Sequence, residues 1–184
     1  MEIILYGNGK DDKFAGKMTA ALSCRYSTLF IGKGIFSSKG KGTPITIFEE
    51  TKSLSVSSDK CLIILRERAD LSKLNLINKG IPILVCSNNR KQIAALSQKS
   101  FRAISCGMLE KDALNFSSLG ENFSMIALQR NLDCFKKIIE PMDIPISHPK
   151  EFSPYLLLSL VAISLFLETP SDLKLDFTNA ITWQ

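Results

Sequence analysis

The sequence predicts one α/β domain covering residues 1–184, with a mostly parallel sheet flanked by helices and a small antiparallel extension in its second half. Two observations predict this class. As far as Ser105, short apolar runs alternate with segments of helical periodicity, which is typical of a parallel sheet covered by helices. Beyond Gly107, apolar runs follow one another with only short turns between them, which is typical of antiparallel strands.

The first half of the chain supplies the parallel strands. The run at residues 62–65 is apolar throughout, as expected of a central strand that is buried on both faces. The glycine- and lysine-rich residues 32–42 and the polar residues 54–59 are expected to be loops. The predicted strands are residues 3–6, 28–31, 44–48, 62–65, 81–85 and 101–105.

Three helices are predicted in this half. Asp11 and Asp12 are expected to open the first, because carboxylates complement the positive end of a helix dipole. The apolar face of this helix comprises Phe14, Met18, Ala21 and Leu22. The second helix passes through Leu71, Leu74 and Ile77 and stops at Gly80, and the third covers residues 89–98 with Ile93, Ala94 and Leu96 on its inner side.

The antiparallel strands of the second half are predicted at residues 115–119, 123–130 and 136–139, with turns at 120–122 and 131–133. Residues 140–149 are expected to run extended, because three prolines fix their backbone. Pro154 should open a final apolar helix that ends near residues 169–170. The last residues are polar and are expected to be loose.

Charge and apolar length exclude two classes of partner. The net charge of +5 comes from scattered lysines that rarely stand beside aromatic residues, so nucleic acid is not expected as a partner. The most apolar stretch, residues 155–167, is shorter than the roughly 20 residues that span a bilayer. The first residues lack the features of a signal peptide. We therefore expect a cytoplasmic protein with no membrane association.

The five cysteines are odd in number, and none forms a C-x-x-C pair. They are Cys24, Cys61, Cys86, Cys106 and Cys134. Free thiols, mostly buried, in a reducing compartment are the expected state. A zinc site is not expected, because the ligands are not closely spaced and His148 is the one histidine.

The segments of the second half follow an order found in one family. The strand at residues 81–85 leads into Ser87-Asn88-Asn89, and the next strand ends at Gly107. Residues 110–114, the extended residues 140–146 and the apolar helix at 155–167 follow. This order resembles the central, ATP-binding domain of the Mur ligase family, which includes the folylpolyglutamate synthetases. There a strand leads into Asn-Asp-Asp-Pro, a second strand ends in glycine, and a meander with an "adv" segment precedes an extended approach to an Ala/Leu-rich helix.

The N-terminal residues take the place of that family's phosphate loop, G-T-x-G-K-T-T. The resemblance therefore implies a P-loop-like fold, with ATP and Mg²⁺ as cofactors if the loop is functional. The phosphate-binding candidates would be Gly7, Asn8, Gly9 and Lys10, and the metal-binding candidates would be Asp11 and Glu49.

The loop also departs from the family pattern. It is one residue short, and Asp11 stands where the family has the hydroxyl that binds Mg²⁺. The carboxylates of Asp11 and Asp12 would repel a triphosphate unless a metal lay between them. A simple turn followed by helix-capping carboxylates is the interpretation that the sequence favours, and phosphate binding is the alternative.

Other candidate residues are similarly open to two interpretations. Glu49 and Glu50 follow a predicted strand, so one of them could be the family's metal-binding glutamate, or both could form a solvated strand edge. The family's histidine has no counterpart after residues 62–65, where the chain reads Arg66-Glu67. His148 lies near the family's His-Asn pair, but Pro149 follows it, and a surface position is expected. The lysines of residues 32–42 could hold an anion or lie in a solvated loop. No catalytic residue is assigned.

These observations favour a non-catalytic Mur-ligase-like domain that acts in binding, regulation or scaffolding. One alternative is a small nucleotide- or phosphate-binding enzyme that uses the loop from Gly7 to Lys10. Another is a partner subunit of a separate ligase. The expected partner is accordingly an unidentified protein or a second copy of the chain.

Overall fold

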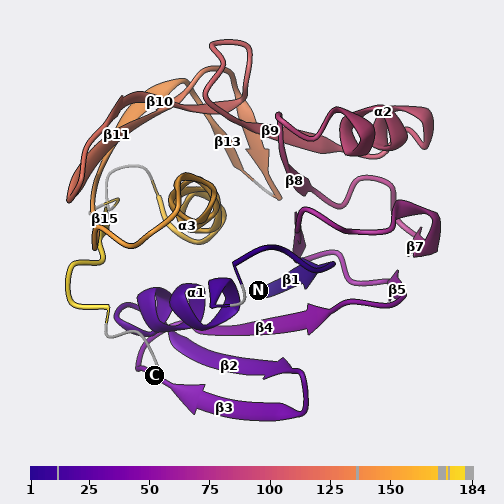
Figure 1. The fold of residues 1–184 in the computed structure, drawn as a ribbon, viewed down its shortest axis with the longest axis horizontal. Helices are drawn as coiled ribbons and strands as arrows, with labels where there is room; N and C mark the ends of the chain where they lie inside the picture. Colours follow the sequence, from indigo (N-terminus) through magenta and orange to yellow (C-terminus); the bar gives the residue numbers. More distant parts are fainter. Residues whose placement is uncertain (12, 136, 170–172, 174, 181–184) are drawn as a thin grey trace.

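A single mixed sheet of eleven strands runs through the molecule (Figure 1). The computed structural model describes residues 1–11, 13–135, 137–169, 173 and 175–180. The strands of this sheet are β1 (Glu2–Tyr6), β2 (Ser27–Gly32), β3 (Ile35–Lys39), β4 (Pro44–Glu50), β6 (Cys61–Leu65), β8 (Ile83–Cys86), β9 (Ala103–Gly107), β10 (Leu114–Leu119), β11 (Phe123–Leu128), β14 (Met142–Ser147) and β15 (Leu175–Asp176). Their order across the sheet is β15-β14-β11-β10-β9-β8-β6-β1-β4-β2-β3.

The predicted fold class is confirmed by the strand directions. From β2 to β10 every neighbouring pair is parallel. Beyond β10 the sheet continues with antiparallel partners, since β11 pairs antiparallel with both β10 and β14. All five residues of β6 are buried, as expected of a central parallel strand that is covered on both faces.

Helices cover the two faces of the sheet unequally. On one face lie α1 (Phe14–Ser23) and α3 (Pro154–Leu167), which contact each other and form the larger apolar core. The antiparallel strands curve around α3 (Figure 1), so this helix is buried on nearly all sides and shows no apolar stripe. The other face carries α2 (Arg90–Gln98) and a single 3₁₀ turn, η1 (Leu71–Lys73), over a smaller core.

The starts of α2 and α3 follow from side-chain caps. The side chain of Asn89 accepts a hydrogen bond from the Gln92 amide, and that of Ser153 accepts one from the Leu156 amide. Pro154 occupies the first turn of α3, where its missing N–H is not needed. The buried side chains of α2 include Gln92 and Leu96, whereas Ala94 is exposed, so its predicted inward position is wrong.

Two predicted loops and one predicted helix of the first half contain strands instead. Residues 32–42 include β3, which pairs antiparallel with β2 through a two-residue turn at Lys33 and Gly34, both with positive φ. Residues 54–59 include β5 (Leu54–Val56), which pairs with β7 (Leu74–Leu76) in place of the predicted helix from Leu71 to Ile77. These strands are short or lie at an edge, so they lack the long apolar runs of the central strands.

The second half also departs from expectation in places. The predicted turn at 131–133 overlaps β12 (Leu132–Cys134), which pairs with β13 (Lys137–Ile139). The residues after α3 are not all loose, because β15 pairs with β14 and Phe177 is fully buried. The predicted helix end near 169–170 is close to the observed end at Leu167, and residue 170 lies outside the described residues. Among the described helices, none is long and apolar enough to span a bilayer.

Candidate functional site

A cavity of about 300 Å³ opens where the parallel strands end. It lies beyond the carboxyl ends of β1, β6, β8 and β9 and is closed on one side by the N-terminus of α3. The chain places β4 on one side of β1 and β6 on the other, so the strand order changes direction next to β1. Crevices at such a point are the usual ligand sites of open α/β sheets.

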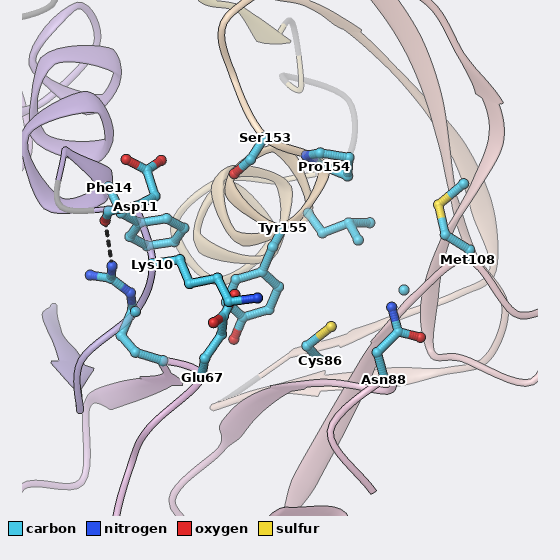
Figure 2. A pocket seen from close by; sticks show the side chains of 14 residues that line it. Lys10, Asp11, Phe14, Glu67, Cys86, Asn88, Met108, Ser153, Pro154 and Tyr155 are labelled. Carbon is cyan, nitrogen blue, oxygen red and sulfur yellow. Dashed lines mark hydrogen bonds between the residues drawn. The ribbon is translucent and has the colours of Figure 1, made fainter.

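The cavity wall combines apolar and polar side chains (Figure 2). Phe14 of α1 stacks on Tyr155 of α3 with their ring centroids 5.9 Å apart. The Tyr155 hydroxyl donates to the Leu65 carbonyl oxygen at 2.7 Å, which fixes the ring against β6, and burial raises the pKa of this tyrosine. The remaining labelled side chains in Figure 2 are those of Lys10, Asp11, Glu67, Cys86, Asn88, Met108, Ser153 and Pro154.

A second hollow of about 570 Å³ adjoins the first, since the two share Glu67, Cys86, Asn88 and Tyr155. It extends to the first turn of α2 and includes Arg90 and Lys91. Because the N-termini of both α2 and α3 face this region, their partial positive charge adds to that of the basic side chains. The two hollows together offer a crevice with apolar walls and a charged rim, to which Glu67 and Asp11 also contribute.

The N-terminal loop lies along this crevice, but its glycines serve packing inside the protein. Gly7 has a φ of +94°, and a Cβ at this position would lie 2.5 Å from the Cα of Ala69. A Cβ on Gly9 would lie 2.6 Å from Nη2 of Arg66. Of the predicted phosphate-binding residues, Gly9 and Lys10 line the cavity, whereas Gly7 and Asn8 do not.

Arg66 contacts the loop and was not among the predicted site residues. Its side chain is 5% exposed, and its Nη2 donates to the Asp11 carbonyl oxygen at 2.6 Å. Its Cζ lies 4.4 Å from the ring centroid of Phe14, within the range of a cation–π contact. Burial lowers the pKa of Arg66, while the negative charge of Glu49 opposes this shift.

The two predicted metal ligands are each engaged by basic side chains. Glu49 Oε1 lies 3.3 Å from Lys33 Nζ and 3.8 Å from Arg66 Nη1. Its side chain is only 4% exposed, so the predicted solvated edge is wrong for this glutamate. Asp11 Oδ2 lies 3.5 Å from Lys17 Nζ, and its Oδ1 accepts from the Lys13 amide at 3.0 Å.

Both candidate carboxylates are thus already paired with basic side chains of the protein. The described part of the chain contains no cluster of three or more His, Cys, Asp or Glu side chains that could hold a metal ion. The first helix begins at Phe14 with Lys13 as its N-cap, so Asp11 precedes the helix rather than opening it. The predicted contribution of Asp12 lies outside the described residues.

His148 is not on the surface, contrary to prediction. It is 2% exposed, and its Nε2 lies 2.9 Å from Oγ of Ser124, which is fully buried. Its Nδ1 lies 3.1 Å from the Pro149 carbonyl oxygen. Both ring nitrogens thus have partners inside the protein, and this serine–histidine pair connects β11 to the end of β14 where no substrate can reach it.

A mostly parallel sheet, a crevice at its carboxyl edge and an antiparallel extension around a buried helix together define a Mur-ligase-like fold. MurF from Acinetobacter baumannii superimposes with a TM-score of 0.52 and 12% identity, over 94% of this chain and 44% of that one. The murein peptide ligase mpl from Psychrobacter arcticus superimposes with a TM-score of 0.52 and 10% identity, over 97% of this chain and 45% of that one. MurF from Thermotoga maritima in complex with ADP superimposes with a TM-score of 0.50 and 11% identity, over 100% of this chain and 48% of that one.

The likeness is one of fold alone. The identities are low, and the chain spans less than half the length of the ligases that it matches. The sequence itself matches no protein-family model and no curated protein.

Proposed function

We propose that this chain is a non-catalytic Mur-ligase-like domain that acts by binding. The observation that carries the proposal is the position of Arg66, whose guanidinium lies between the N-terminal loop and Glu49. An arginine keeps its positive charge at all physiological pH values. Glu49 is therefore compensated by a permanent charge belonging to the protein, where ligase chemistry would need a carboxylate free to bind a metal.

The electrostatics of this arrangement disfavour Mg²⁺. A divalent ion about 4 Å from a guanidinium would meet a repulsion of roughly 8 kcal/mol at an effective dielectric of about 20, which offsets its attraction to the Glu49 carboxylate. Lys33 also faces Glu49 and would add to this repulsion. Removing Arg66 from Glu49 would in turn leave a buried carboxylate with one cation fewer.

The cavity supports a binding role that needs no metal. Its volume of about 300 Å³ suits a small ligand, and Lys10 and Asn88 provide polar groups at its wall. Phe14, Tyr155 and Met108 provide apolar contact. A small polar molecule with an apolar or planar part would match this combination of groups, since Asp11 and Glu67 also line the cavity.

Isothermal titration calorimetry with Mg·ATP tests the proposal. We expect no heat of binding at micromolar protein and nucleotide, and no release of phosphate over hours. Micromolar affinity would overturn it, and would favour the small nucleotide-binding enzyme. In that case Lys10→Ala should abolish binding, whereas Lys13→Ala should not, because Lys13 is exposed and does not line the cavity.

A second candidate function is a partner subunit of a separate ligase. The observation that favours it is an apolar row across three strands, in which Phe48 of β4, Ile31 of β2 and Phe36 of β3 are register partners. The row continues from the buried Ile4 to Phe36, which is 72% exposed at the sheet edge. Parallel sheets normally have both faces covered, so a partner chain could complete this one.

Photo-crosslinking from position 36 in the native cell tests the partner hypothesis. A crosslinked product that contains a ligase chain, identified by mass spectrometry, would support it. Attachment to a second copy alone, or equal yields from an exposed control position such as Lys52, would count against it. We further propose that residues 1–184 form one domain and act in the cytoplasm.

A further inference from the structure

Two of the five cysteines lie side by side at the edge of the cavity. Cys86 is the last residue of β8, and its register partner in β9 is Cys106. Register partners in neighbouring strands are about 4.8 Å apart and point to the same face of the sheet. Disulfides join Cα atoms about 4.4 to 6.8 Å apart, so the backbone already provides the spacing that a disulfide needs.

The same two thiols approach a common neighbour. Cys86 and Tyr155 both line the two hollows, and α3 packs against β8 and β9, the strands that carry the two cysteines. Cys106 Sγ lies 3.5 Å from the Val85 carbonyl oxygen, the residue just before Cys86. The strand register and the direction of the Cys106 side chain therefore both place its sulfur beside the end of β8.

The two thiols differ in access to solvent. Cys86 lines both hollows and is half-buried, so a small solute in the crevice can reach its sulfur (Figure 2). Cys106 is fully buried, and burial raises its pKa well above the ordinary value. An oxidant should therefore meet Cys86 first, with Cys106 available only to a group that is already at its side.

We propose that Cys86, in the cavity wall, and Cys106, buried beside it, form an oxidisable dithiol, with a hydroperoxide such as hydrogen peroxide as the oxidant. The Cys86 sulfur attacks the peroxide, the O–O bond breaks, and Cys86 becomes a sulfenic acid with release of one water. The Cys106 sulfur then displaces the sulfenic oxygen as a second water, and a disulfide forms. Two thiols lose one electron each, and the peroxide is reduced to two waters.

The other cysteines lack this arrangement. Cys24 is exposed near the end of α1, while Cys61 and Cys134 are buried in β6 and β12. In the described strands, none of these three is a register partner of another cysteine. Cys24 is thus a natural control, since it is more exposed than Cys86 and has no neighbouring thiol in register.

Peptide mapping after peroxide treatment of the reduced full chain tests the proposal. We expect alkylatable thiols to fall from five to three, with a Cys86–Cys106 linked peptide and a mass lower by two hydrogens. Cys24→Ser should still form the bond. Cys86→Ser should not, and because Cys86 is half-buried this variant should fold.

A Cys106→Ser chain should stop at the first step, leaving a sulfenic acid on Cys86 that dimedone labels. Retention of five free thiols in the wild type would overturn the proposal. So would a disulfide that involves Cys24, or the same linked peptide at equal yield from the denatured chain. The wild-type mapping decides the matter even if the buried Cys106→Ser variant fails to fold.

Discussion

Gly9 and Arg66 depend on each other. The guanidinium can reach the Asp11 carbonyl because Gly9 has no Cβ, and a Cβ there would lie 2.6 Å from Nη2. In the sequence this glycine looks like part of a phosphate loop. In the structure it leaves room for an arginine that belongs to the protein.

Arg66→Met should lower the free energy of unfolding by about 3 kcal/mol, because it leaves the buried Glu49 with one cation fewer and removes a hydrogen bond to the loop. Urea denaturation measures the change. Lys33→Met removes the other partner of Glu49. Because the Lys33 side chain is half exposed, this change should cost less than about 1 kcal/mol. Equal effects of the two variants would contradict the assigned role of Arg66.

Gly9→Ala extends this prediction to a double-mutant cycle. In the wild-type background the new methyl group collides with the guanidinium, and we expect a loss of about 1 to 3 kcal/mol. In the Arg66→Met background the flexible side chain can move aside, so the same substitution should cost clearly less. Additive effects would show that Gly9 is needed for some other reason.

At the scale of the elements, the ends of α1 and α3 are joined by one carboxylate. Glu168, the C-cap of α3, accepts from Arg25 Nη2 at 2.7 Å and also from the Tyr26 hydroxyl. Burial, followed by the hydrogen bond to Glu168, raises the pKa of Tyr26 to about 12. This contact fixes the separation of the two helices that form the larger core.

This raised pKa predicts a pH dependence of stability. A tyrosine whose pKa is near 10 when unfolded and about 12 when folded stabilises the protein below pH 10 and loses that contribution between pH 10 and 12. The contribution is about 3 kcal/mol in total. Tyr26→Phe lacks it, so the stability of the wild type relative to this variant should fall by about 3 kcal/mol across that range. Urea denaturation at several pH values measures this, and a constant difference would contradict it.

The features of the fold that could be predicted from the sequence are those that depend on a local pattern of residues. The run at residues 62–65 predicted β6 because burial on both faces demands an apolar side chain at every position. β3 was missed because an edge strand has one partner and four of its five residues are exposed. The Arg66–Glu49 contact could not be predicted either. It arises because β4 and β6 flank β1, which places their carboxyl ends together, and strand order is not a local property.

At the scale of the whole molecule, one core crosses the boundary between the parallel and antiparallel parts. The larger apolar cluster includes Ile3 of β1 and Met18 of α1, together with Ile126 of β11 and Ile144 of β14. Leu160 of α3 belongs to the same cluster and is fully buried. Because α3 contacts both α1 and the strands β8 to β10, it connects the two parts.

We therefore expect the chain to unfold as a single domain. Leu160→Ala should lower the free energy of unfolding by about 2 to 5 kcal/mol, because it opens a cavity where the two parts meet. Hydrogen exchange measured by mass spectrometry should show that the opening free energy of the most protected amides falls by the same amount in β1 and in β11. Leu119→Ala, at a position that is 46% exposed, is the matched control and should have little effect. If Leu160→Ala released the amides of β11 and left those of β1 protected, the two parts would be separate folding units, and the single domain covering residues 1–184 would be wrong.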